Sequence, residues 1–321
     1  MILEYYINIR KNRGENMIYT VTLNPAIDYL INLDNLEIGR INRVEYEKVY
    51  AGGKGINVSN MLKQLGYENT ALGFISGFTG EFIVNTLMEK GINNKFIRLK
   101  NGFTRINVKV KGKEETEING KGPAITNNEL NELYKILENL NSSDILVLAG
   151  SIPSTLDDKL YENIMDRIKD NNVKVVVDAT KNLLLNVLKY KPFLIKPNNH
   201  ELEEIFNVKL NNNEEIIKYA KKLKEMGALN VLVSMGKDGA LLLTENDEVY
   251  VSNVAKGIVK NSVGAGDSMV AGFIAGYLNT NSYSEGLKLG AASGGATAFS
   301  YDIATKEYID EIKKQIIVTK I

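Results

Sequence analysis

The chain of 321 residues contains no cysteine and a single histidine, His200. Without cysteine it can form neither disulfides nor thiolate-ligated zinc sites, and a thiolate nucleophile is impossible. With one histidine, a multi-histidine metal site is excluded, and a Ser-His-Asp triad would have to use His200. Catalysis by this chain must therefore rest on carboxylates, lysine and backbone dipoles, with or without a hard cation.

Long apolar runs and an excess of charge of one sign are also missing. Lys plus Arg and Asp plus Glu number 39 each, so no global field draws the chain to nucleic acid or to a membrane surface. No apolar stretch approaches the roughly 20 residues that cross a bilayer. Residues 1–16 lack the apolar core of a signal peptide, and we interpret them as an extension outside the folded unit. We expect a cytoplasmic protein that binds anions through local clusters of cations.

Short β-branched runs alternate with amphipathic segments from residue 17 onward. The runs are apolar on both faces, as in strands that helices cover on each side; they are Met17–Leu23, Asp144–Leu148, Val173–Val177, Phe193–Ile195 and Asn230–Ser234. Helical spacing lies between them, for example over 157–169 and 214–226. The alternation predicts one α/β domain over 17–321 with a mostly parallel sheet.

Two stretches lack the helices of this pattern. Residues 27–50 alternate apolar and polar positions, and residues 103–120 predict two strands around a turn at Lys111–Lys113. The period of two in the first of these strands sends Arg105, Asn107 and Lys109 to one face. We expect these stretches to form a small antiparallel sheet attached to the main domain.

The motif NSVGAGDS at 261–268 runs into an apolar helical segment. Glycines just before a helix leave backbone N–H groups free for a phosphate, and the helix dipole adds partial positive charge. Asp267 would lie beside that anion site, where a carboxylate can accept a proton from a hydroxyl. An aspartate that merely caps the helix is the alternative interpretation.

A second glycine-rich motif, AGGKGIN at 51–57, precedes another helical segment. Its glycines allow close backbone approach, Lys54 supplies charge, and Asn57 can donate or accept hydrogen bonds. A tight turn with a solvated lysine is the alternative. The sequence has no Walker-type loop, and no GxGxxG follows the first strand, which disfavours a dinucleotide-dependent oxidoreductase.

Together the motifs resemble a known enzyme family. GGKGIN at 52–57 and VGAGDS at 263–268 are similar to the two signatures of the ribokinase-like (PfkB) carbohydrate kinases. Other segments resemble its phosphosugar branch, with the bacterial 1-phosphofructokinases as the most similar group; they are TLNPAID at 22–28, TRINVK at 104–109, ETEIN at 115–119 and KPNNHE at 196–201. The resemblance implies a ribokinase-like three-layer α/β/α domain with a small antiparallel β-sheet lid, and ATP and Mg²⁺ as cofactors.

The resemblance also implies a role for individual residues. The sugar hydroxyls would be held by Asp28, Gly53 and Asn57, and the phosphate already on the substrate by Lys54, Arg105 and Ser151. Asp267 would be the base, with Gly264, Ala265 and Gly266 stabilising the transferred group. ATP would contact Lys196, Asn198, Ser234, Gly236, Ser262, Gly264 and Gly266. Mg²⁺ would be held by Glu201 and Asn198 through water, and His200 is expected on the surface.

The implied reaction is ATP-dependent phosphorylation of the 6-hydroxyl of fructose 1-phosphate, giving fructose 1,6-bisphosphate. Kinases for tagatose 6-phosphate and fructose 6-phosphate share Asp28, Arg105, Ser151 and Asp267, so both remain alternatives. A non-catalytic sugar-phosphate sensor, which would lose the base or the phosphate-binding glycines, is the alternative of a different class. We also expect a homodimer paired through the lid sheets, because pairing covers their exposed edges and outer face.

Overall fold

A sheet of ten strands forms the centre of the structure, a computed structural model that describes residues 17–321. The interpretation of residues 1–16 as an extension lies outside the described residues. In spatial order the strands are β14 (Val318–Lys320), β13 (Val249–Ser252), β12 (Ala240–Leu243), β11 (Asn230–Ser234), β10 (Leu194–Ile195), β9 (Lys174–Asp178), β8 (Ile145–Ala149), β1 (Ile18–Thr22), β4 (Asn69–Ile75) and β5 (Asn93–Arg98). The strands from β11 to β5 pair in parallel, whereas β12, β13 and β14 pair antiparallel at one edge. The predicted mostly parallel sheet is confirmed.

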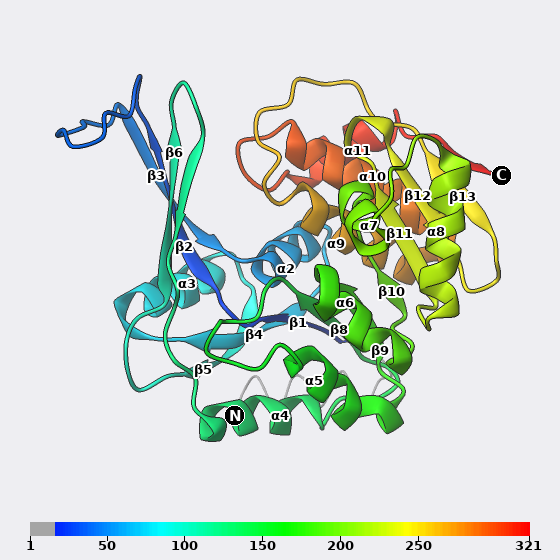
Figure 1. Cartoon of the computed structure of the whole chain (residues 1–321), viewed down its shortest axis with the longest axis horizontal. Coiled ribbons are helices and arrows are strands. Elements are labelled where there is room, and N and C mark those ends of the chain that lie inside the picture. Colours follow the sequence, from blue (N-terminus) through cyan, green and yellow to red (C-terminus); the bar gives the residue numbers. More distant parts are fainter. Residues whose placement is uncertain (1–16) are drawn as a thin grey trace.

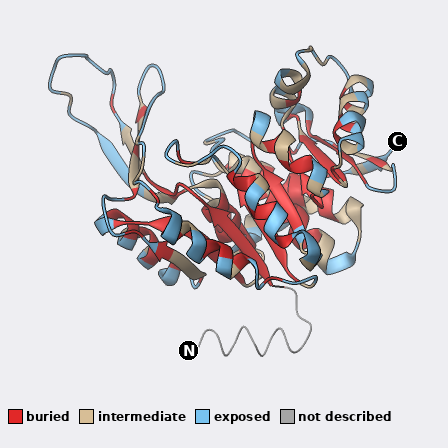
Figure 2. Cartoon of the chain, turned by 60° about the horizontal axis from the view of Figure 1, so that its bottom comes forward, coloured by how far each residue is buried: buried red, intermediate tan, exposed pale blue. Residues whose placement is uncertain are grey.

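Helices cover both faces of this sheet (Figure 1). One face is covered by α4 (Asn127–Leu137), α5 (Leu160–Ile168), α6 (Lys181–Val187), α7 (Asn199–Phe206) and α8 (Asn213–Glu225). The other is covered by α2 (Lys54–Gln64), α3 (Gly77–Glu89), α9 (Ala265–Thr280), α10 (Tyr283–Ala298) and α11 (Lys306–Lys313). Within β1, Ile18 packs into one core and Tyr19 into the other, as the alternation of strand side chains requires. The predicted three-layer arrangement is confirmed, with the buried strands in its middle layer (Figure 2).

A second sheet of four strands projects from the main body (Figure 1). Its order is β3 (Tyr46–Gly52), β2 (Ala26–Asn32), β6 (Arg105–Lys111) and β7 (Thr116–Asn119). The outer pairs are antiparallel as expected, but β2 and β6 in the middle run parallel. The middle pair is parallel because the chain passes through the main domain between these strands, and no hairpin joins them. We call this sheet the lid sheet.

The helices α9 and α10 pack closely against each other. A Cβ atom at Gly272 would lie 2.6 Å from the carbonyl oxygen of Leu289, and one at Gly276 would lie 2.6 Å from that of Glu285. Only glycine permits this separation of the two backbones, as expected from the small residues in both segments. Within residues 17–321, no helix has the length and apolar character needed to span a membrane.

Candidate active site

A cavity of about 560 Å³ lies between the lid sheet and the carboxyl ends of the parallel strands. Open α/β sheets bind their ligands at this edge. Most of the residues singled out from the sequence line the cavity: Asp28, Gly53, Lys54, Asn57, Arg105, Ser151, Lys196, Asn198, Glu201, Ser234, Ser262, Gly264, Gly266 and Asp267. The lid and the main domain therefore contribute to one cleft.

Two of the predicted residues do not line the cavity. Ala265 is the first residue of α9, and its N–H donates to the carbonyl oxygen of Ser262 at 3.2 Å. Gly236 opens the 3₁₀ turn Gly236–Asp238 between β11 and β12, and no atom lies within 4 Å of the position that its Cβ would occupy. Its φ of 56° suits a residue in a turn. The predicted contacts of Ala265 and Gly236 with the reacting groups remain predictions.

Asp267 is the third residue of α9, and Gly264, at φ 80°, is the residue that caps the helix. No side chain caps this helix, so the interpretation of Asp267 as an N-cap is wrong. The residue is 5% exposed, and its Oδ2 accepts a hydrogen bond of 2.8 Å from Nδ2 of Asn57 on α2. The carboxylate is therefore held at the mouth of α9, beside the N–H groups that a helix start leaves free.

Asp178 at the end of β9 is a site residue that the sequence analysis missed. It is 1% exposed; its Oδ2 lies 3.1 Å from Nζ of Lys54, and its Oδ1 lies 3.3 Å from Nζ of Lys196. A usable signal was present, because Asp178 directly follows the apolar run Val173–Val177, and strand ends meet at the ligand-binding edge. Lys54, predicted to hold the sugar phosphate, and Lys196, predicted to face ATP, thus share one carboxylate.

The charged groups of this network shift one another's pKa values. Burial raises the pKa of Asp267 to about 6, and the charge of Asp178 adds to the rise, while Lys54, Asn57 and Lys196 oppose it. Burial also favours a higher pKa for Asp178, but the two lysines outweigh it and the pKa is lowered. Burial favours a lower pKa for Lys54, yet Asp178 and Asp267 leave it raised. At neutral pH, Asp267 is a carboxylate basic enough to accept a proton from a hydroxyl.

The lid side of the cleft carries a second polar cluster around Asp28. Its Oδ1 accepts a hydrogen bond of 2.9 Å from Nδ2 of Asn107, and its Oδ2 lies 3.1 Å from Nζ of Lys109. Arg105 donates from Nε to the carbonyl oxygen of Asn24 at 3.1 Å. Burial lowers the pKa of Arg105, and the negative charge of Asp28 opposes this. The expected common face of Arg105, Asn107 and Lys109 is present, although only Arg105 was predicted to bind substrate.

Asn198 and Glu201 form a reciprocal cap at the start of α7. The Asn198 side chain accepts a hydrogen bond of 2.8 Å from the Glu201 N–H, and Oε2 of Glu201 accepts one of 2.8 Å from the Asn198 N–H. No group of three or more His, Cys, Asp or Glu side chains placed to hold a metal ion occurs in residues 17–321. This donor set fits Mg²⁺, which keeps several waters and binds mostly to substrate phosphates. His200 is exposed on the same turn, as expected.

Residues 21–307 match the model of the pfkB family of carbohydrate kinases. The chain belongs to this family. It is 48% identical over 305 residues to a 1-phosphofructokinase of Bacillus subtilis, covering 95% of this chain and 100% of the relative. It is 38% identical over 304 residues to a D-tagatose-1-phosphate kinase of Bacillus licheniformis, covering 94% and 99%. The phosphofructokinase-2 of Escherichia coli in complex with fructose-6-phosphate aligns at a TM-score of 0.85, with 26% identity and coverage of 94% and 99%. The predicted family, fold and phosphotransferase class are confirmed.

The charge network predicts the effect of Asp178→Asn. Loss of the negative charge removes one cause of the raised Asp267 pKa and leaves both lysines without their counterion, so the Asp267 pKa should fall below about 6. The variant should also lose about 3 kcal/mol of unfolding free energy, because a buried ion pair is broken. Carboxyl ¹³C NMR titration measures the first effect, with Asp267→Asn to assign the signal, and urea unfolding measures the second. An unchanged midpoint for Asp267 would contradict the network, and exposed Asp170→Asn is the matched control.

Proposed function

We propose that this carbohydrate kinase transfers the γ-phosphoryl group of ATP to the 6-hydroxyl of fructose 1-phosphate. The observation that carries the proposal is the position of the buried Asp267 carboxylate, which lies in one cleft with the cationic side chain of Arg105. A phosphorylated acceptor needs both features, a base at one end and cations at the other. The named activity of the Bacillus subtilis relative supports the choice of acceptor.

Asp267 is the general base in this proposal. Its carboxylate accepts the proton of the attacking hydroxyl, and the hydrogen bond from Asn57 orients it for this task. Negative charge that builds on the transferred group is stabilised by the amino-terminal end of α9 and by Lys54 and Lys196. Gly266 lets Lys196 approach, since a Cβ there would lie 3.3 Å from the Lys196 Nζ.

Mg²⁺ and ATP would occupy the main-domain side of the cleft. Glu201 retains one carboxylate oxygen outside the cap and lines the cavity, so it would hold the cation together with water and phosphate oxygens. When bound, Mg²⁺ neutralises the β- and γ-phosphates. The lid sheet lines the cleft opposite the strand ends and would exclude water from the acceptor side, because water could otherwise accept the phosphoryl group.

The acceptor specificity is tested with four sugar phosphates. We expect the highest kcat/KM for fructose 1-phosphate and lower values for fructose 6-phosphate and tagatose 6-phosphate. Tagatose 1-phosphate completes the panel because of the relative from Bacillus licheniformis. A coupled assay of ADP release with purified enzyme measures all four, and a highest kcat/KM for a 6-phosphate would overturn the proposed substrate.

Replacement of the base separates a kinase from a sugar-phosphate sensor. Both the carboxylate and the phosphate-binding glycines are present, which favours the enzyme. Asp267→Asn should lower kcat by about 10²-fold to 10⁴-fold, the usual contribution of a general base. Calorimetry should find sugar-phosphate binding largely intact. Near-normal turnover would remove Asp267 from this role, and a wild-type chain that binds the sugar phosphate without turnover would support the sensor.

We further propose a homodimer paired through the lid sheets. On the lid face turned away from the cleft, Tyr29, Val108 and Ile118 occupy one row across neighbouring strands. Ile118 is 61% exposed, and Ile38 in the adjoining loop is 96% exposed. A second copy would bury these apolar side chains and cover the sheet edges.

We also propose that the protein is located in the cytoplasm, in keeping with the absence of cysteine.

The dimer is tested by sedimentation velocity. The wild-type chain should sediment as a dimer, and Ile118→Lys should shift it to monomer, because the new charge cannot be buried in an apolar contact. Met226→Lys, at an exposed apolar residue on the end of α8, is the matched control and should remain dimeric. A monomeric wild type would contradict the proposal.

A further inference from the structure

A ladder of polar side chains crosses the lid sheet on its cleft face. Asp28 of β2 lies opposite Asn107 of β6, and Asn107 lies opposite Asn119 of β7. Lys109 follows Asn107 by two positions on β6, so its side chain is on the same face. All four residues line the cleft. Asp28 therefore meets its neighbours because of strand register, and the register also places it on the cleft face of the lid sheet.

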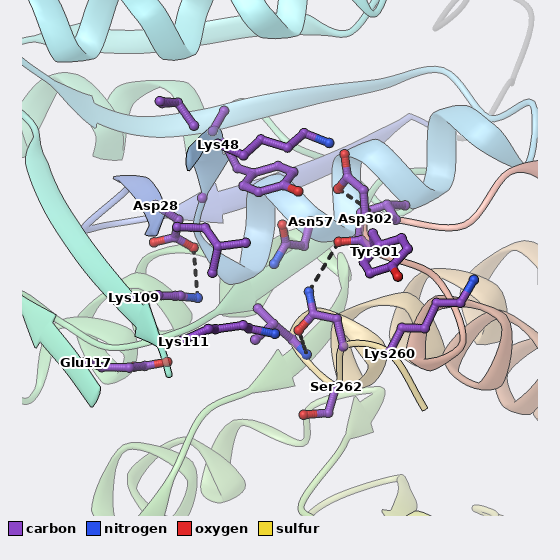
Figure 3. Close-up of a pocket in the computed structure, with 18 of the residues that line it drawn as sticks. Asp28, Lys48, Asn57, Lys109, Lys111, Glu117, Lys260, Ser262, Tyr301 and Asp302 are labelled. Atoms are coloured by element: carbon purple, nitrogen blue, oxygen red, sulfur yellow. Dashed lines mark hydrogen bonds and ion pairs between the residues drawn. The ribbon is translucent and has the colours of Figure 1, made fainter. Parts of the chain in front are cut away.

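The Asp28 carboxylate is enclosed on three sides. Asn107 donates to Oδ1 at 2.9 Å, and the ammonium group of Lys109 lies 3.1 Å from Oδ2. On the third side a Cβ at Gly52 would lie 2.6 Å from Oδ2, so a larger residue there would displace the carboxylate. Figure 3 shows Lys109 reaching to Asp28. Both residues line the cleft and also a second cavity of about 390 Å³. The open side of the carboxylate faces the cavities.

The position of Asp28 creates an electrostatic problem for an anionic substrate. A carboxylate that accepts hydrogen bonds from sugar hydroxyls would also repel the phosphate of the same sugar. The Asp28 and Lys109 side chains are 16% and 19% exposed, so their attraction is screened less than that of a surface pair. Lys109 is thus placed to do two things. Its positive charge cancels the negative charge of Asp28, and its contact with Oδ2 fixes the orientation of the Asp28 carboxylate.

We propose that Lys109 is a positioning residue for the sugar phosphate and acts through Asp28. It holds the carboxylate in the orientation that accepts sugar hydroxyls and neutralises it, while Asn107 fixes the other oxygen. A direct contact of Lys109 with the substrate phosphate is the competing role. The inference rests on the proposed function, because Asp28 can orient a sugar phosphate only if one binds in this cleft.

A double-mutant cycle with Asp28→Asn, Lys109→Met and the combined variant tests the role. Lys109→Met should lower kcat/KM for fructose 1-phosphate by about tenfold or more, since contacting residues couple strongly. The KM for ATP should not change. In the Asp28→Asn background the same substitution should have an effect of less than about twofold, because the partner that it positions is already altered. An equal loss in both backgrounds would identify a direct phosphate contact and overturn the proposal.

Further measurements separate this inference from folding and from the proposed function. For variants that turn over too slowly to assay, calorimetric titration with fructose 1-phosphate gives the binding affinities from which the double-mutant cycle is calculated. If Lys109→Met lowers the midpoint of urea unfolding, Lys109→Arg is used in its place. The Lys109→Arg variant keeps the positive charge and should retain most of the affinity for fructose 1-phosphate. Loss of that affinity would overturn the proposal. Lys135→Met, on the exposed face of α4, is the control and should match the wild type. A wild type that binds no sugar phosphate would overturn the proposed function itself.

Discussion

The cleft depends on the pairing of one buried carboxylate with two lysines. An isolated buried charge is strongly unfavourable, and Asp178 and Lys196 are both nearly inaccessible. Their ion pair, completed by Lys54, makes the burial of each possible. Since Lys54 begins α2 and Lys196 follows β10, the same interaction joins three separate elements at the edge of the sheet. Any rearrangement of these elements would leave a buried charge unpaired.

The pairing also decides how the neighbouring carboxylate behaves. Asp267 is buried beside Asp178, and both burial and the like charge keep its pKa raised. The lysines limit this rise, so that the group is still ionised at neutral pH. Each ammonium group has three donors and uses one on Asp178, which leaves donors for phosphate oxygens. One network can thus supply a proton acceptor and cations for a transferred phosphoryl group.

The lid sheet also pairs a carboxylate with a cation at close range. Asp28 is the carboxylate there, and Lys109 and Asn107 satisfy its oxygens. On both sides of the cleft, cations are matched by carboxylates at close range. A chain with equal numbers of acidic and basic residues therefore binds anions by local arrangement, without a field of one sign over its surface.

Much of this architecture follows from the sequence alone. The period of two in Arg105–Val110, the apolar runs of the central strands and the glycines before α2 and α9 are local signals, and local steric and solvation preferences determine what they form. Asp267 could be identified because a glycine-rich helix start marks its own anion site.

Asp178 could not be assigned a role in the same way. Its place after an apolar run marks it only as a residue at the ligand-binding edge, and its function arises from two lysines that lie far from it in the sequence. Likewise, the parallel pairing of β2 with β6 and the contact of Asp28 with Lys109 exist only once the chain has passed through the main domain, because pairing between distant strands is decided by tertiary packing.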